Sequence, residues 1–163
     1  MAYVTQNKLM VGTSTMMFSP NAVMSRAMLV TVLYRMNGSP SVAGMTAPFT
    51  DVPSGQWYTD AVIWAYNCGV VDGTSPTQFA PAQNVTREQM ATMLARFYAL
   101  SGITAAGSAD GYADADAISA WAVNGVALCT ARGLVQGDPQ GRFRPQSDLT
   151  RAQIAAILSR MAE

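Results

Sequence analysis

The chain has 163 residues, of which 50% are apolar and 12% are charged, and its ten basic and ten acidic residues cancel. The apolar content predicts a folded core and excludes a disordered chain. The zero net charge argues against a nucleic-acid binder and against attachment to an anionic membrane surface, and no apolar run reaches the roughly 18–20 residues of a membrane-spanning helix.

The N-terminal segment predicts only half of a structural unit. Residues 2–12 align with residues 63–73, so the first unit begins inside its first helix and lacks the opening that later units have. The apolar face of such a half-unit has no partner in its own repeat. We therefore expect either a fragment of a longer protein or a second segment or chain that covers this edge. No signal-peptide pattern follows Met1.

One short phrase then recurs along the chain. It consists of Phe-x-Pro, four further residues, and a Ser or Thr followed by Arg. The arginines are 61 and 64 residues apart (87 − 26 = 61; 151 − 87 = 64), and a second arginine follows nine residues after each of them. Such a period indicates stacked copies of one supersecondary unit. The three phrases occupy residues 18–28, 79–89 and 143–153.

Each complete repeat predicts a helix, a loop and a second helix. In residues 61–71 apolar residues recur at steps of three and four, and Gly69 and Gly73 mark the end of that helix. The loop 72–85 is rich in Gly, Pro, Ser and Asn. A second helix is predicted from Thr86, with an apolar stripe for the core. That stripe is formed by Met90, Met93, Leu94, Phe97 and Tyr98.

The expected fold is all-α. We predict a partial repeat in 1–38, a linker in 39–48, a repeat in 49–100, a linker in 101–111 and a repeat in 112–163. Because one helical pair cannot bury both of its faces, the repeats must pack on each other. A closed arrangement about a pseudo-three-fold axis is expected, and a solenoid is the alternative.

The hydroxyl of each phrase has a structural explanation, whereas its arginine has none from the local sequence. Thr86 and Thr150 each precede a Gln by three residues, which is the capping-box pattern, and Ser25 is a cap without the returning side chain. An arginine at the first helical position is mildly unfavourable, by about 0.3–1 kcal/mol. Two explanations have equal weight: an ion pair or carbonyl clamp between neighbouring repeats, and an anion site at the helix N-terminus.

Other candidate residues favour structural roles. Trp57 and Trp121 lie near helix starts, where core anchors are the favoured interpretation and sugar-stacking platforms the alternative. Cys68 and Cys129 fall in apolar helical stretches, which favours buried free thiols, although a disulfide is compatible with secretion. Asp114 belongs to an acidic cluster that is interpreted as a turn. Without histidine no nucleophile–base pair or usual zinc site is apparent, so neither catalysis, a metal nor a cofactor is expected.

Taken together, these motifs resemble the S-layer homology (SLH) repeat, over nearly the whole chain outside the linkers. The resemblance implies repeats that work in threes and fold as a three-pronged, mostly helical pseudo-trimer, of which the first repeat is truncated here. The motifs that carry it are Phe49-Thr-Asp-Val52, Trp57-Tyr58, Gly69-Val-Val-x-Gly73, Phe79-x-Pro81 and Thr86-Arg87-Glu-Gln-Met-Ala91.

The resemblance also implies a function. SLH modules anchor secreted proteins to the bacterial cell wall by binding a secondary cell-wall polysaccharide, often with pyruvylated N-acetylmannosamine. Family grooves lie between adjacent repeats and use the Thr-Arg phrase with nearby Gly and Trp residues. The last residue of the phrase is usually Glu but is Met28, Gln89 or Gln153 here. The implied ligand-binding residues are Arg26, Arg87, Arg151, Gly12, Gly73, Gly137, Trp57 and Trp121.

We therefore expect a non-catalytic, extracellular wall-attachment module that binds an anionic glycopolymer. The alternative is a protein-interaction or assembly module of a larger surface protein, whose missing half-repeat is supplied by another segment or chain. An enzyme ranks third.

Overall fold

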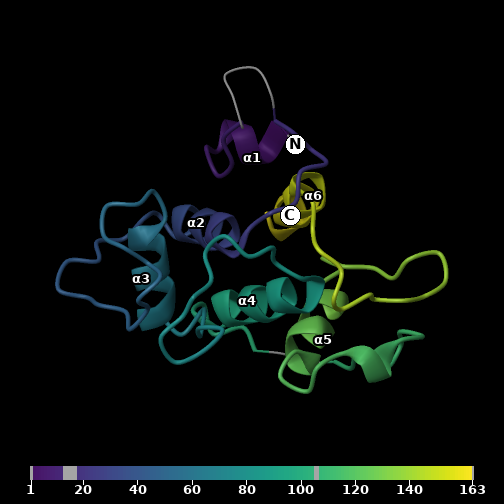
Figure 1. Ribbon diagram of the computed structural model, residues 1–163. Helices are drawn as coiled ribbons and strands as arrows, with labels where there is room; N and C mark the ends of the chain where they lie inside the picture. The colour runs from purple at the N-terminus through teal and green to yellow at the C-terminus, as the bar shows by residue number, and fades with distance from the viewer. Residues whose placement is uncertain (1, 13–17, 105–106, 163) are drawn as a thin grey trace.

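The computed structural model describes residues 2–12, 18–104 and 107–162, and within these ranges its regular elements are helical (Figure 1). The expectation of an all-α chain is confirmed. No helix in the described ranges combines the length and apolarity needed to cross a membrane. The elements are α1 (Ala2–Gln6), α2 (Arg26–Met36), α3 (Thr59–Asn67), α4 (Arg87–Ala99), the 3-10 turn η1 (Ala115–Ala117), α5 (Val123–Ala131) and α6 (Arg151–Met161).

Helices α2, α4 and α6 begin at the caps that the sequence predicts. The hydroxyls of Ser25, Thr86 and Thr150 each accept a hydrogen bond of 3.3 Å from the amide three residues later. Both capping boxes are complete, because the side chains of Gln89 and Gln153 accept from the amides of Thr86 and Thr150. Each helix therefore starts where its own sequence satisfies the first free amides.

The predicted apolar stripe of α4 is confirmed for its central residues. Met90, Met93 and Leu94 are buried, whereas Phe97 and Tyr98 at the end of the helix are half-buried. The loop residue Phe79 is fully buried. The prediction of a buried thiol is confirmed for Cys129 and wrong for Cys68. Cys68 is exposed because it caps the C-terminus of α3, where the chain leaves the packed face.

Helices pair across the boundaries between repeats. Helix α2 packs on α3, α4 packs on α5, and α6 packs on α1, so the two helices of one repeat belong to different pairs (Figure 1). The pairing of α6 with α1 brings the two ends of the chain together and buries Val4, Leu9 and Met10. The truncated first repeat therefore packs on another segment of this chain, the last helix of the third repeat.

Three buried residues join the repeats at the centre. Each immediately precedes a helix cap, donates a backbone hydrogen bond to one of the other two and accepts one from the third. The Val85 amide donates to the Met24 carbonyl (2.9 Å), the Met24 amide to Leu149 (2.8 Å), and the Leu149 amide to Val85 (3.3 Å). All three side chains are fully buried. A closed ring of backbone hydrogen bonds thus links the three phrases.

Candidate functional site

The arginine of each phrase reaches into the Phe-x-Pro loop of another repeat. The Nε of Arg26 donates to the Phe79 carbonyl at 2.8 Å, and its guanidinium lies 4.8 Å from the centre of that ring. Its Nη2 also contacts the Asp72 carbonyl at 3.5 Å. Stacking and carbonyl donation together compensate a cation that the helix N-terminus disfavours.

The same arrangement occurs twice more. Arg87 donates to the carbonyls of Phe143 (2.6 Å) and Gln136 (3.2 Å) and stacks on the Phe143 ring at 4.8 Å. Arg151 donates to the carbonyls of Phe18 (2.8 Å) and Val11 (2.5 Å) and lies 4.7 Å from the Phe18 ring. Of the two explanations for these arginines, the carbonyl clamp between repeats is confirmed.

One end of each guanidinium is left for other partners. Within the described ranges no protein acceptor bonds the Nη1 atom of Arg26, Arg87 or Arg151, and no buried side-chain nitrogen or oxygen there lacks a partner. Arg26 and Arg151 are only 4% and 6% exposed, and each lines a hollow described below. Burial lowers the pKa of all three arginines below the ordinary 12.5, although a guanidinium stays protonated in proteins. A partly desolvated cation gains from an anion placed beside it.

A hollow of about 460 Å³, here called the α4 hollow, lies against α4. Its lining joins three repeats, because Arg26 comes from the first, Gly73 from the second and Trp121 from the third. This volume falls within the range of small-molecule pockets. The lining residues that matter below are Arg26, Asp72, Gly73, Gln89, Arg96 and Trp121.

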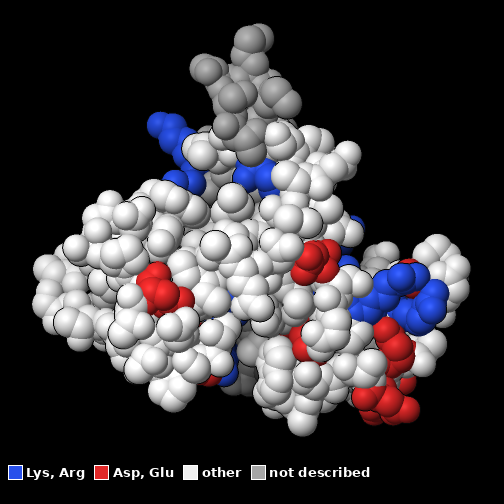
Figure 2. All heavy atoms as spheres, viewed as in Figure 1, with Lys and Arg blue, Asp and Glu red and all other residues white. Residues whose placement is uncertain are grey.

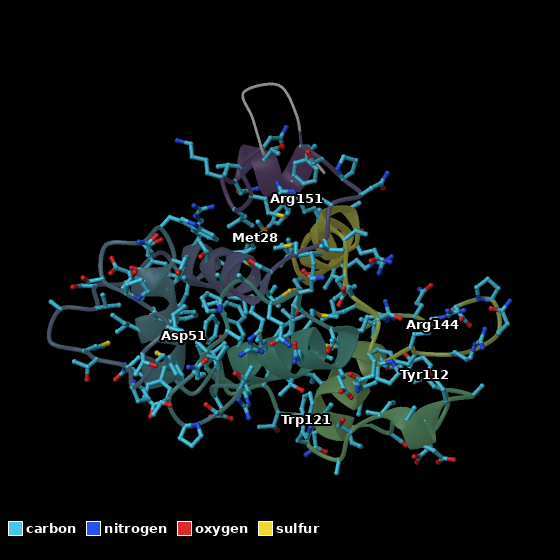
Figure 3. All side chains as sticks on the ribbon, in the orientation of Figure 1. Met28, Asp51, Tyr112, Trp121, Arg144 and Arg151 are labelled. Carbon is cyan, nitrogen blue, oxygen red and sulfur yellow. The ribbon has the colours of Figure 1, made fainter. Side chains whose placement is uncertain are left out.

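A second hollow of about 200 Å³, the α2 hollow, occupies the equivalent place beside α2. Figure 3 shows two of its residues, Arg151 and Met28, close together near α1 and α2, while Trp121 lies beside α5. The lining residues that matter below are Val11, Gly12, Met28, Arg35, Trp57 and Arg151.

The structure thus sorts six of the eight sequence-predicted site residues into two equivalent groups. Each group has an arginine, a glycine and a tryptophan from three different segments. The remaining two, Arg87 and Gly137, line neither hollow. They are neighbours nonetheless, because Arg87 bonds the carbonyl of Gln136, but no tryptophan accompanies them in the described ranges.

Trp57 and Trp121 are surface residues, so the favoured interpretation of them as core anchors is wrong. They are 60% and 56% exposed, because each sits in the turn before its helix rather than on the packed helical face. The core tryptophan is Trp64, on the inner face of α3, where it is 2% exposed. An indole left on the surface beside a hollow offers a flat apolar face to a ligand.

Gly73 and the aspartates have structural reasons for their identity. A Cβ on Gly73 would lie 2.2 Å from the Ser75 carbonyl oxygen, so no side chain fits there. Asp51, beside α3 in Figure 3, accepts from the amides of Phe79 and Ala80 at 2.8 and 2.7 Å. Asp114 accepts equivalent bonds from the next loop, at 2.7 and 2.8 Å. In the described ranges no group of acidic or sulfur side chains could hold a metal.

Two functional candidates were not predicted as site residues. Arg35 and Arg96 are the second recurrent arginines of their repeats, and each lines a hollow. Arg35 donates to the Leu9 carbonyl at 3.1 Å, whereas Arg96 forms an ion pair of 2.6 Å with the Asp72 carboxylate. The nine-residue spacing of the two arginines was the available signal, because it keeps both on one helix.

The charged groups are sparse and separate on the face shown in Figure 2. At one edge of this face acidic and basic side chains lie side by side. Among the ion pairs, Asp138 pairs with Arg142 at 3.4 Å and with Arg144 at 2.6 Å. This face carries no continuous basic stripe of the kind that tracks a nucleic-acid backbone.

Comparison with known proteins agrees with the repeat pattern. The S-layer homology domain family matches residues 1–27, 48–91 and 111–155. An endoglucanase of Bacillus sp. (strain KSM-635) is 31% identical over 94% of this chain and 16% of its own length. An amylopullulanase of Thermoanaerobacterium thermosulfurigenes is 30% identical over 93% of this chain and 8% of its own. The surface-layer 125 kDa protein of Lysinibacillus sphaericus is 30% identical over 90% and 12%.

The chain spans 8 to 16% of the length of these relatives. Two of them are named as enzymes and one as a surface-layer protein, so the shared part is a separate module common to proteins of different activity. The module serves cell-surface anchoring, so the chain is located at the cell surface or cell wall. Three matched segments that cover most of the sequence show that the chain belongs to the S-layer homology domain family.

Proposed function

We propose that the chain attaches its parent protein to the bacterial cell wall, without catalysis, by binding an anionic, pyruvylated secondary cell-wall polysaccharide. The observation that carries the proposal is the repeated composition of the two hollows. Each is lined by the arginine of a recurrent phrase, a glycine and an exposed tryptophan.

The chemistry of these groups suits such a polymer. A pyruvate ketal carries a carboxylate, which a partly desolvated guanidinium binds through charge-assisted hydrogen bonds. The exposed indoles of Trp57 and Trp121 offer apolar platforms for the faces of sugar rings. The third copy, with Arg87 and Gly137, lacks a tryptophan in the described ranges, so we expect it to contribute least.

We also infer that the three repeats form a three-pronged pseudo-trimer. The ring of backbone bonds through Met24, Val85 and Leu149 supports this arrangement, as does the pairing of α6 with α1. A solenoid would join each repeat only to its sequence neighbours, and would leave the first and third repeats apart. The burial of α1 against α6 also weakens the alternative of an assembly module with an open apolar edge.

The test is sedimentation of the purified chain with cell-wall sacculi, before and after hydrofluoric acid strips the polymer. Trp57→Ala and Trp121→Ala are the informative variants, because both side chains are exposed and their loss leaves the core intact. We expect each to weaken binding to intact sacculi and the double variant to abolish it. Equal binding of the wild-type chain to stripped and intact walls would contradict the proposal.

The clamp arginines are poorer probes, because they join the repeats as well as facing the hollows. Arg26→Lys keeps the charge but loses the planar donor set, so it separates the two roles only if the fold is checked by circular dichroism. If the Arg26→Lys variant is as stable as the wild-type chain but no longer binds sacculi, a direct contact of Arg26 with the ligand is supported.

A further inference from the structure

The two hollows are built alike but differ in charge. The described residues that line the α2 hollow include two arginines, Arg35 and Arg151, and no carboxylate. Those that line the α4 hollow include two arginines, Arg26 and Arg96, and one carboxylate, Asp72. The α2 hollow therefore carries two positive charges, and the α4 hollow carries one in net terms (2 − 1 = 1).

The difference arises at a single equivalent position, the residue before the site glycine. It is Val11 before Gly12 and Asp72 before Gly73. The Asp72 carboxylate already occupies Arg96, with 2.6 Å between Oδ2 and Nη2. Arg35, the counterpart of Arg96, donates only to a neutral carbonyl, that of Leu9. An incoming anion thus competes with a built-in anion in the α4 hollow and with none in the α2 hollow.

The other side chains differ in the same sense. The α4 hollow offers the amides and hydroxyls of Thr74, Gln83, Gln89 and Thr92. Among the described residues that line the α2 hollow, Thr31 is the one uncharged polar side chain, and Met28 replaces Gln89. The α4 hollow is also the larger, at about 460 against 200 Å³. A roomy site rich in neutral donors and acceptors suits a hydroxylated sugar, whereas a small apolar site with two cations suits a compact anionic substituent.

We infer that the two hollows take different parts of the ligand: the α2 hollow binds the carboxylate-bearing group, and the α4 hollow binds a neutral sugar, with Val11 and Asp72 setting the difference. The inference rests on the proposed function and adds a division of labour to it. Both positions are open to substitution, because Val11 is 61% exposed and the Asp72 side chain 73% exposed. The backbone carbonyls of Val11 and Asp72 accept the bonds from Arg151 and Arg26, and a side-chain substitution preserves these carbonyls.

The test uses a pyruvylated N-acetylmannosamine methyl glycoside and its methyl ester, a neutral probe of nearly the same shape. The chain is labelled with 5-fluorotryptophan, and the ¹⁹F signals are assigned with Trp→Phe variants. Trp57 then reports on the α2 hollow and Trp121 on the α4 hollow, while the buried Trp64 is an internal control.

We expect the carboxylate probe to shift the Trp57 signal at lower concentration than the Trp121 signal, and the ester to lose that preference. Val11→Asp should weaken the carboxylate probe at Trp57 by roughly tenfold, the effect of one charge-assisted bond. The matched neutral variant Val11→Asn should change it less than about threefold, and 0.5 M salt should shrink the contrast between the two variants. Asp72→Asn should strengthen the carboxylate probe at Trp121 several-fold.

Two results would overturn the inference while leaving polymer binding intact. One is a carboxylate response at Trp121 that exceeds the response at Trp57. The other is an equal effect of Val11→Asp and Val11→Asn on the carboxylate probe. Silence of both exposed tryptophans towards either probe, with equal sedimentation on stripped and intact sacculi, would instead overturn polymer binding itself and this inference with it.

Discussion

Helix α3 meets its neighbour through a large aromatic residue, whereas α5 meets its neighbour through a glycine. Trp64 of α3 lies 5.6 Å from the Tyr34 ring of α2 and 6.4 Å from the Phe97 ring of α4. In α5 the equivalent residue is Leu128, and Gly125 faces α4 so closely that a Cβ would lie 2.8 Å from the Ala91 backbone. Equivalent helices of two repeats thus form different contacts, here called joints: a large side chain fills the α3 joint, and the absence of a side chain at Gly125 allows the close α5 joint.

The turns before these two helices differ as well. The turn with Trp57 is held locally, because the Thr59 hydroxyl donates to the Pro53 carbonyl and accepts from the Gln56 amide. The turn with Trp121 is held from α4, where the buried carboxylate of Glu88 accepts from the amide and hydroxyl of Ser119. Close approach of α5 to α4 lets a side chain of one helix fix the turn of the other.

Removal of the large aromatic should have the greatest effect. Trp64→Ala is expected to lower the free energy of unfolding by about 3–5 kcal/mol, because the cavity has aromatic walls that cannot collapse. Leu128→Ala at the equivalent place should cost less, about 2 kcal/mol. Urea denaturation followed by circular dichroism measures both, and equal losses would show that the two joints do not differ in this way.

Filling the close joint should come next. Gly125→Ala is expected to lower the free energy of unfolding by up to about 3 kcal/mol, because the added methyl meets backbone atoms of Ala91 and Thr92 that have no flexible end. The matched change in the other joint, Ala61→Gly, should cost only about 1 kcal/mol from helix propensity. Helix propensity alone predicts that Gly125→Ala stabilises the chain, so a higher melting temperature would refute the steric limit.

The clamp on the Trp121 turn is expected to contribute less. Glu88→Gln places a donor where the carboxylate accepted from both Ser119 and Gln146, so about 1–2 kcal/mol should be lost. Thr59→Val, which breaks the local bonds of the Trp57 turn, should cost about 1 kcal/mol. A double-mutant cycle of Glu88→Gln with Ser119→Ala isolates the pair, and strict additivity would exclude the clamp.

The reactivity of the two cysteines allows α3 and α5 to be compared in the wild-type chain. Burial raises the pKa of the Cys129 thiol to about 12, and its Sγ lies 3.8 Å from the Ala91 carbonyl oxygen. Cys68 at the end of α3 is exposed. Iodoacetamide at pH 8 should therefore modify Cys68 quickly and leave Cys129 unmodified in the folded chain, because the thiolate is the reactive form. Mass spectrometry measures both sites, and equal rates would contradict the burial of Cys129.

The smallest expected effect is a pH dependence of stability in the loop that contains Asp138. Hydrogen bonds from the Arg142 amide and the Arg144 side chain lower the pKa of Asp138 from 3.8 to about 2. Since the folded-state value is the lower one, the stabilisation is complete above about pH 4 and is lost as the pH falls towards 2. The equivalent Thr74 has no such dependence. Carbon-13 chemical shifts of the Asp138 carboxyl measure its titration directly, and a midpoint near 3.8 would show that these bonds are not formed.

The sequence by itself determined the starts of the three capped helices and the all-α class. Each cap needs only a hydroxyl, joined in two of the three by a glutamine within one turn, and each apolar stripe needs only a spacing along one helix, so neighbouring residues suffice. The recurrence of the arginines at a fixed period also fixed the number of copies and the family resemblance. The two groups of site residues were present in the sequence, but their partition between hollows was not.

Only the tertiary structure decided where the key side chains point. Arg26 meets a carbonyl 53 residues away and Arg151 one 133 residues away, distances over which local sequence carries no directional information. Trp57 and Trp64 are seven residues apart, yet Trp64 packs against Tyr34 of α2 and Phe97 of α4, whereas Trp57 lies exposed in the turn before α3. The pairing of Asp72 with Arg96 likewise exists only because the folded loop brings them together.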